Sequence, residues 1–262
     1  MKKTILWLLL WAVVAASNAL AQSTVKTYLP TQYWTYWQAD YQFKDKAVLI
    51  FEQQTRSSVD SDYNFDKKFP TNQFLRLQTG LTYEKPINEH WSWGLGYRWA
   101  YMQSFNLQVY RGYATHRGKI GSVLFTKTLM ADRRVPTNEK TVSSWRFRLW
   151  LGLSRQFRIT AKHKLNVVAS AEFFKYREDD YDKTQERRRI DRTRLRLMAQ
   201  YPVSPKVLLS VFAMRQTDYL KALVTSNPPP VTPETYNLNR ITPIYGLMLR
   251  WHINSTDSNI IQ

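Results

Sequence analysis

Large apolar side chains alternate with small or polar ones along residues 91–101. Every odd position from Trp91 to Tyr101 is aromatic or leucine, whereas the even positions carry serine, glycine, arginine or alanine. Successive side chains of a β-strand point to opposite faces, so this segment predicts a strand with one apolar and one polar face. The same two-residue period recurs along most of the chain, a pattern typical of transmembrane β-barrels.

The alternation predicts an all-β chain of about twelve strands. Eleven are expected at 33–43, 47–56, 73–83, 91–104, 107–116, 119–130, 143–158, 165–176, 188–201, 207–218 and 241–253, with a twelfth near 24–29. A turn is expected at Arg117–Gly118, and long polar connections include 131–142 and 219–240. Short and long connections alternate, except at 103–106, as in outer-membrane barrels with tight periplasmic turns and long external loops. We therefore expect a closed antiparallel transmembrane barrel of about twelve strands, or ten, with both chain ends in the periplasm.

Alternation alone leaves open which face points inward, because a soluble lipocalin-type barrel would enclose the apolar face. The polar face, however, carries many arginines, and a charged residue facing lipid at mid-depth costs about 2–4 kcal/mol. We therefore expect the apolar face outside and a lumen in which arginines bind anions, with Glu52 and Glu172 as counter-ions. These arginines are Arg56, Arg76, Arg98, Arg146, Arg148, Arg192, Arg194, Arg196 and Arg250.

Tyrosine and tryptophan cluster at the ends of the expected strands, where the aromatic girdles of membrane barrels lie. The candidate interface residues are Tyr83, Trp91, Tyr101, Trp145, Tyr176, Tyr201 and Trp251. The last strand alternates as expected for recognition by barrel-assembly machinery. It departs from that pattern in continuing into a polar tail without a terminal phenylalanine.

The first residues predict export. A basic start at Lys2 and Lys3 precedes an apolar run, Ile5–Ala16, and Ala19-Leu20-Ala21 fits a small-x-small cleavage site. About twelve apolar residues are too few for a membrane-spanning helix, which needs roughly 20. We therefore expect a signal peptide at 1–21, a barrel at 22–254 in the bacterial outer membrane, and a polar tail at 255–262.

The composition limits the classes of partner that the protein is expected to bind. The chain has no cysteine, so neither disulfides nor thiol chemistry is expected. Its net charge is +18, and the basic residues are scattered along strands rather than gathered on one helix. For an exported chain this favours outer-membrane lipid and small anionic solutes as partners over nucleic acid.

With the strands placed, the chain resembles a family of outer-membrane barrels of unknown function that is common in Bacteroidota. The resemblance rests on Phe51–Arg56, Leu81–Glu84 leading to Gly94–Arg98, Arg146–Leu149, Ala171–Phe174 and Asp191–Leu195. It implies a porin-like architecture. It implies no established activity and no catalytic residues.

Three functions remain open. Alternate arginines at 192, 194 and 196 favour a small porin-like or structural barrel, since inward arginines either select anions or form ion-pair networks that fill the lumen. A lipid-processing enzyme of the phospholipase or lipid A deacylase type would need a serine and a histidine at the rim. The histidines are His90, His116, His163 and His252, and no Gly-x-Ser-x-Gly motif accompanies them. A surface adhesin would act through 219–240. No metal-ligand spacing or cofactor motif is present, so we expect neither.

Overall fold

The computed structural model describes residues 24–59, 74–102, 105–138, 141–160, 164–179, 188–223 and 235–254. The expected signal peptide and polar tail lie outside these ranges. The described chain is all-β, and none of it forms a helix able to cross a membrane. Its strands are β1 (Thr24–Tyr28), β2 (Gln32–Gln42), β3 (Val48–Ser58), β4 (Phe74–Pro86), β5 (Trp91–Met102), β6 (Asn106–Ile120), β7 (Val123–Pro136), β8 (Ser144–Arg158), β9 (Lys164–Glu178), β10 (Arg192–Ser204), β11 (Val207–Leu223) and β12 (Thr235–His252).

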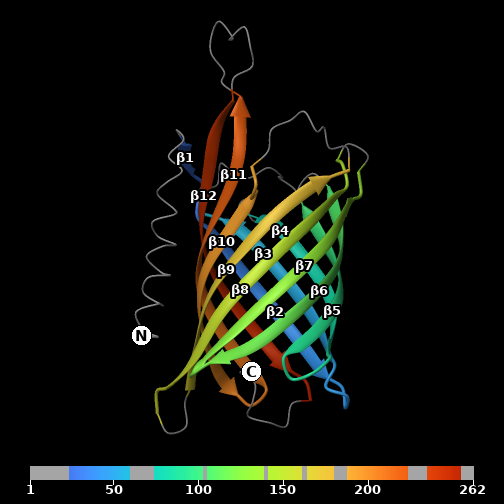
Figure 1. Ribbon diagram of the computed structural model, residues 1–262, viewed down its shortest axis with the longest axis vertical. Coiled ribbons are helices and arrows are strands. Elements are labelled where there is room, and N and C mark those ends of the chain that lie inside the picture. Colours follow the sequence, from blue (N-terminus) through green and yellow to red (C-terminus); the bar gives the residue numbers. More distant parts are fainter. Residues whose placement is uncertain are drawn as a thin grey trace, which may run out of the picture.

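Eleven of these strands close into a barrel. From β2 to β12 each strand pairs antiparallel with the next, and β12 then pairs parallel with β2, from Ile244 opposite Gln32 to His252 opposite Asp40. The strand β1 lies outside this wall. It pairs parallel with β12 over Asn237–Ile241, on the edge that β2 occupies farther along (Figure 1).

The expected strand near residue 24 is present and completes the twelve, but its position differs from the expectation. With five residues, β1 is shorter than the 9–11 residues that cross a bilayer. The wall therefore has an odd number of strands, and its closing pair is parallel rather than antiparallel. The chain ends themselves lie outside the described residues; within these, β2 begins at the end of the barrel opposite to the one where β12 finishes.

The connections follow the expected alternation. The short connections follow β2, β4, β6, β8 and β10, whose last residues lie at one end of the barrel, called the turn end here; the opposite end is called the loop end. The turn between β6 and β7 falls at Gly121–Ser122, not at Arg117–Gly118, because Ile120 pairs with Val123 and Gly121 adopts a φ of 61°. Glycine at the first position of a two-residue hairpin loop permits this backbone. The strands β7, β11 and β12 also extend into the expected loops 131–142 and 219–240.

The apolar face of the wall points outward, as expected. Along β5, Trp91 and Leu95 are 46% and 56% exposed, whereas the intervening Ser92 and Gly94 are buried. The inner face is not wholly polar, however. A buried apolar cluster lies inside, formed by Trp34, Val168, Met198, Phe212, Met214 and Ile244.

The parallel pairing of β12 with β2, called the seam here, depends on Gly246 of β12. A Cβ atom there would lie 2.1 Å from the Phe212 ring and 2.7 Å from the Trp34 carbonyl oxygen. The ring can turn aside, but the carbonyl belongs to the β2 backbone and moves only if the seam opens.

We expect Gly246→Ala to lower the free energy of unfolding by about 1–3 kcal/mol, the usual cost of overpacking. A urea titration of the refolded barrel measures this. Gly112→Ala is the matched control, because the nearest atom to its added Cβ would be Leu95 Cδ2 at 3.7 Å. Equal stability of the two variants would contradict the prediction.

Candidate functional site

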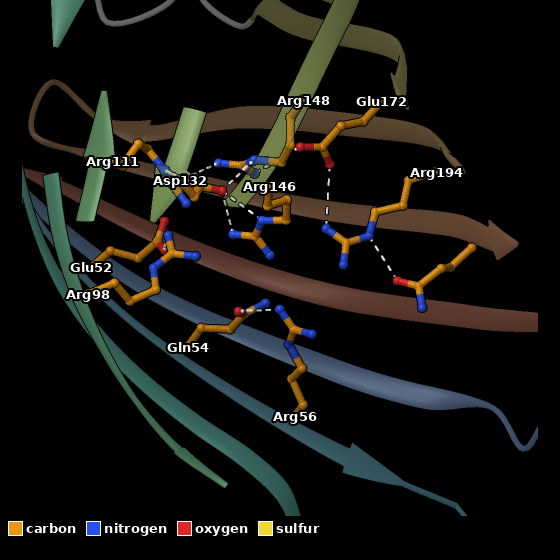
Figure 2. Close-up of polar contacts among 11 residues, drawn as sticks. Glu52, Gln54, Arg56, Arg98, Arg111, Asp132, Arg146, Arg148, Glu172 and Arg194 are labelled. Carbon is orange, nitrogen blue, oxygen red and sulfur yellow. Dashed lines mark hydrogen bonds and ion pairs between the residues drawn. The ribbon is translucent and has the colours of Figure 1, made fainter. Parts of the chain in front are cut away.

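A fully buried carboxylate, Asp132 of β7, organises a charged network inside the barrel. Arg111 Nε lies 2.7 Å from its Oδ1, and Arg146 Nη2 and Arg148 Nε lie 2.6 and 3.0 Å from its Oδ2. These arginines come from the adjacent strands β6 and β8. One carboxylate thus faces three guanidinium groups (Figure 2).

The contacts continue around the wall beyond β8. Glu172 of β9 accepts hydrogen bonds from Arg148 at 2.9 Å and Arg194 at 3.4 Å. Arg194 Nε in turn donates to Gln216 of β11 at 2.9 Å. We call the set Arg111, Asp132, Arg146, Arg148, Glu172 and Arg194 the lumen network. It links β6 to β10 by alternating charges, and Gln216 extends it to β11.

A second group lies on the opposite arc of the wall. Glu52 of β3 accepts hydrogen bonds from Arg98 at 2.6 Å and from Gln38 at 2.8 Å. Arg98 belongs to β5, so its side chain crosses β4 at Gly80, where an added Cβ would lie 3.5 Å from both its Cβ and its Nε. The glycine therefore leaves the space through which Arg98 reaches its carboxylate.

The lumen is filled with side chains at this level. Asp132 is 0% exposed, Arg148 8% and Gln54 1%, and Arg98 and Glu52 expose 19% of their side chains. A cavity lined by Arg98, Arg111 and neighbouring residues has a volume of about 10 Å³, room for about one water molecule. A wide aqueous channel would leave such a lining accessible to water.

Toward the loop end, arginines outnumber acids. Arg56 and Arg76 stand directly opposite each other on β3 and β4, an arrangement that is destabilising for like charges. Arg56 donates to Gln54 at 3.0 Å and lies 3.7 Å above the Trp34 ring. Among the described residues, the buried Nε atoms of Arg56, Arg76 and Arg134 have no hydrogen-bond partner. We call these three the loop-end arginines.

All nine arginines expected in the lumen lie on the inner face. The structure brings Arg146, Arg148 and Arg194 into one network with Glu172, and Arg98 together with Glu52. The others are separate: Arg192 pairs with Asp218, Arg250 pairs with Asp40 at 3.0 Å, Arg196 lies 5.7 Å above the Phe212 ring, and Arg56 and Arg76 are in the loop-end set.

Six of the seven expected interface aromatics point outward. Trp91, Trp145 and Trp251 are exposed, and Tyr83, Tyr101 and Tyr201 are half-buried on the same face. The seventh, Tyr176, instead faces the lumen.

Tyr176 stacks on Phe174 at an interplanar angle of 8°, and Arg134 lies 5.4 Å above its ring. Residue 176 lies an even number of positions after the inward Glu172, so the strand period itself turns it inside. Its place at a strand end was the misleading signal.

One ion pair marks the outer rim at the loop end. Arg133 donates two hydrogen bonds to Asp179, at 2.6 and 2.5 Å, and lies 5.5 Å above the Trp145 ring. These hydrogen bonds hold the pKa of Asp179 below its ordinary value. The pair therefore persists at neutral pH and is lost only as the pH falls through that lowered pKa.

Several lumen residues escaped the sequence reasoning. Asp132 was assigned to a loop, because the run Asp132-Arg133-Arg134 looks like the end of a strand. Arg111 was missed because Tyr110 and Tyr113 place an aromatic ring on each face of its strand. Neither face of that segment therefore looked polar in the sequence. Trp34 was missed because tryptophans were expected on the outer face; Trp34 is buried inside, whereas Trp37 of the same strand is exposed.

Two of the histidines, His90 and His116, lie side by side at the turn end with ring centroids 6.1 Å apart, whereas His252 lies apart from them. His116 points outward beside Trp91, with ring centroids 4.8 Å apart, whereas His252 lies in the lumen with Nδ1 2.7 Å from Asp40 Oδ2. His90 is in a turn, and His163 is outside the described residues. Within the described ranges, no three histidine, aspartate or glutamate side chains come together as metal ligands.

A closed wall, apolar outside and charged inside, defines an outer-membrane-type β-barrel. The chain belongs to the family described as "Protein of unknown function (DUF2490)", whose model matches residues 31–227. No curated protein matches the chain. Among solved structures it is similar to LpxR from Salmonella typhimurium, with 12% identity and a TM-score of 0.43 over 76% of this chain and 83% of that one.

We expect Asp132→Asn to lower the free energy of unfolding by about 3–5 kcal/mol, because it leaves three arginines without their shared counter-charge. Urea titration in detergent measures the loss. Asp45→Asn is the control, since Asp45 pairs with Lys85 at 3.1 Å in an exposed turn. That variant should unfold like the wild type, and an equally stable Asp132→Asn would contradict the role of the network.

Proposed function

We propose that the protein resides in the bacterial outer membrane as a barrel closed to bulk flow, whose lumen binds small anions near its loop end. The observation that carries this proposal is the burial of the charged lumen network inside the wall. A filled interior favours a structural barrel with narrow, anion-favouring passage over a wide porin.

The outer surface supports the membrane location. Exposed leucines and aromatics follow one another along β5, and Leu195 and Leu197 of β10 are 55% and 58% exposed. In water such a surface would be a large apolar patch, whereas facing acyl chains it is the expected exterior. The short turns would then lie in the periplasm and the longer connections outside the cell.

The loop-end arginines support anion binding. Arg56 and Arg76 place two positive charges opposite each other without an acidic partner among the described residues. Guanidinium groups offer planar, paired donors that suit phosphate-like oxyanions. An anion between them would relieve the repulsion and use the free Nε donors.

In planar bilayers we expect the purified barrel to give at most a small current, because the lumen network fills the passage. Any current should favour chloride over potassium, and the Arg56→Gln/Arg76→Gln double variant should lose that preference. Arg155→Gln is the matched control, because Arg155 lies over Phe157 on the outer wall near the turn end. Large conductance steps would refute closure, and cation preference would refute the anion-binding lumen.

Phosphate should raise the unfolding temperature of the wild type more than chloride does at equal ionic strength. A ligand at a hundred times its Kd stabilises the folded state by about 2.7 kcal/mol. The double variant should show no such difference, and Arg155→Gln should behave like the wild type. Equal stabilisation of all three proteins would mean that phosphate binds elsewhere.

A further inference from the structure

The outer wall carries a groove of about 870 Å³ across β7 to β12. Short side chains, Ala169 and Ala171 of β9 and Ala213 of β11, lower its floor. Longer ones rise on either side, with Phe125 and Leu151 on one side and Tyr245 on the other. Its volume falls within the range of small-molecule sites, and its lining is mostly apolar.

The strand outside the wall helps to bound this groove. Tyr28, the last residue of β1, lines it together with Ile241, the residue opposite it on β12. Its side chain is 71% exposed, although it projects beside an apolar hollow. The position of β1 therefore gives the groove a wall that the eleven-stranded barrel alone would not supply.

One charged side chain points outward at the groove. Arg215 of β11 is exposed and lies between the outward residues Leu195 and Pro243 of the neighbouring strands. No described residue forms a hydrogen bond or ion pair with it. An outward arginine is costly at the middle of a bilayer and tolerated near its interface.

The register places Arg215 near the interface at the loop end. Ala213, one outward position nearer the turn end, pairs with Tyr245. The Tyr245 ring lies 6.4 Å from that of Tyr33, which stands near the loop-end start of β2. Such tyrosines mark the level of lipid headgroups. Arg215 is therefore at the depth of lipid phosphates, with the alanine floor extending toward the acyl chains.

We infer that this groove binds a phosphate-bearing membrane lipid, with acyl chain on the alanine floor and phosphate on Arg215. The charge-assisted contact from a guanidinium to a phosphate is directional and strong. This inference rests on the membrane location under the proposed function, but not on the anion-binding lumen. It identifies one headgroup position within a groove whose lining is mostly apolar.

Native mass spectrometry of the full barrel, extracted in detergent and incubated with phosphatidylglycerol, tests the inference. The wild type should retain the lipid. Phosphatidylcholine with the same acyl chains should be retained less, because its choline ammonium balances the phosphate charge that Arg215 would pair with. Arg215→Gln should weaken retention of phosphatidylglycerol about tenfold, as expected for loss of a hydrogen bond to a charged group. Ala171→Trp, which fills the floor, should abolish retention of both lipids.

Arg155→Gln should retain lipid as the wild type does, since its arginine is outward but outside the groove. The inference fails if the wild type retains no lipid, or if Arg215→Gln and Ala171→Trp both retain it normally. Conductance separates this from the proposed function, because the groove variants should leave bilayer currents unchanged. A chain that stays dispersed in buffer without detergent would overturn the membrane location itself.

Discussion

The balance of charge inside the barrel is the constraint on which the rest of the structure depends. Strands that place apolar side chains outside must place the alternate residues inside, and here many of those are arginines. Asp132 makes this arrangement possible because one buried carboxylate meets Arg111, Arg146 and Arg148 within 3.0 Å. Isolated buried charges are too costly to keep, so the acids hold the arginines in place and the arginines hold the acids.

Other contacts inside the barrel also link strands that the backbone ladder does not pair directly. Arg98 crosses β4 at Gly80 to reach Glu52, and Trp34 lies beneath both Arg56 and Arg194, at 3.7 and 5.0 Å. Cation–π contacts of this kind let an aromatic ring take part in a charged interior. The buried apolar cluster beside the seam and the charged arc opposite are therefore two parts of one packed interior.

Sequence alone supplied the barrel class, the outward apolar face and the inward position of the nine arginines, because a two-residue period fixes the face of every residue in a strand. It could not supply the partners of those arginines, since Asp132 and Arg111 become neighbours only through the register of β6 with β7. Residues at strand ends were the weak point. Tyr176 lies inside, as the two-residue period requires, although its place at a strand end suggested the membrane interface. The turn was predicted at Gly118 but falls at Gly121. The parallel seam left no local signature, because alternation is the same whichever way the neighbouring strand runs.

That seam limits how the chain could be rearranged. In barrels closed by antiparallel strands, the first and last strands meet at the same rim, and a short linker can join them for circular permutation. Here β2 starts at one rim and β12 finishes at the other, so a linker would have to run the full height of the wall, about 3.3 Å for each of the eleven residues of β2. Topological engineering of this fold would therefore have to cut and reconnect it elsewhere, at the hairpins of the turn end.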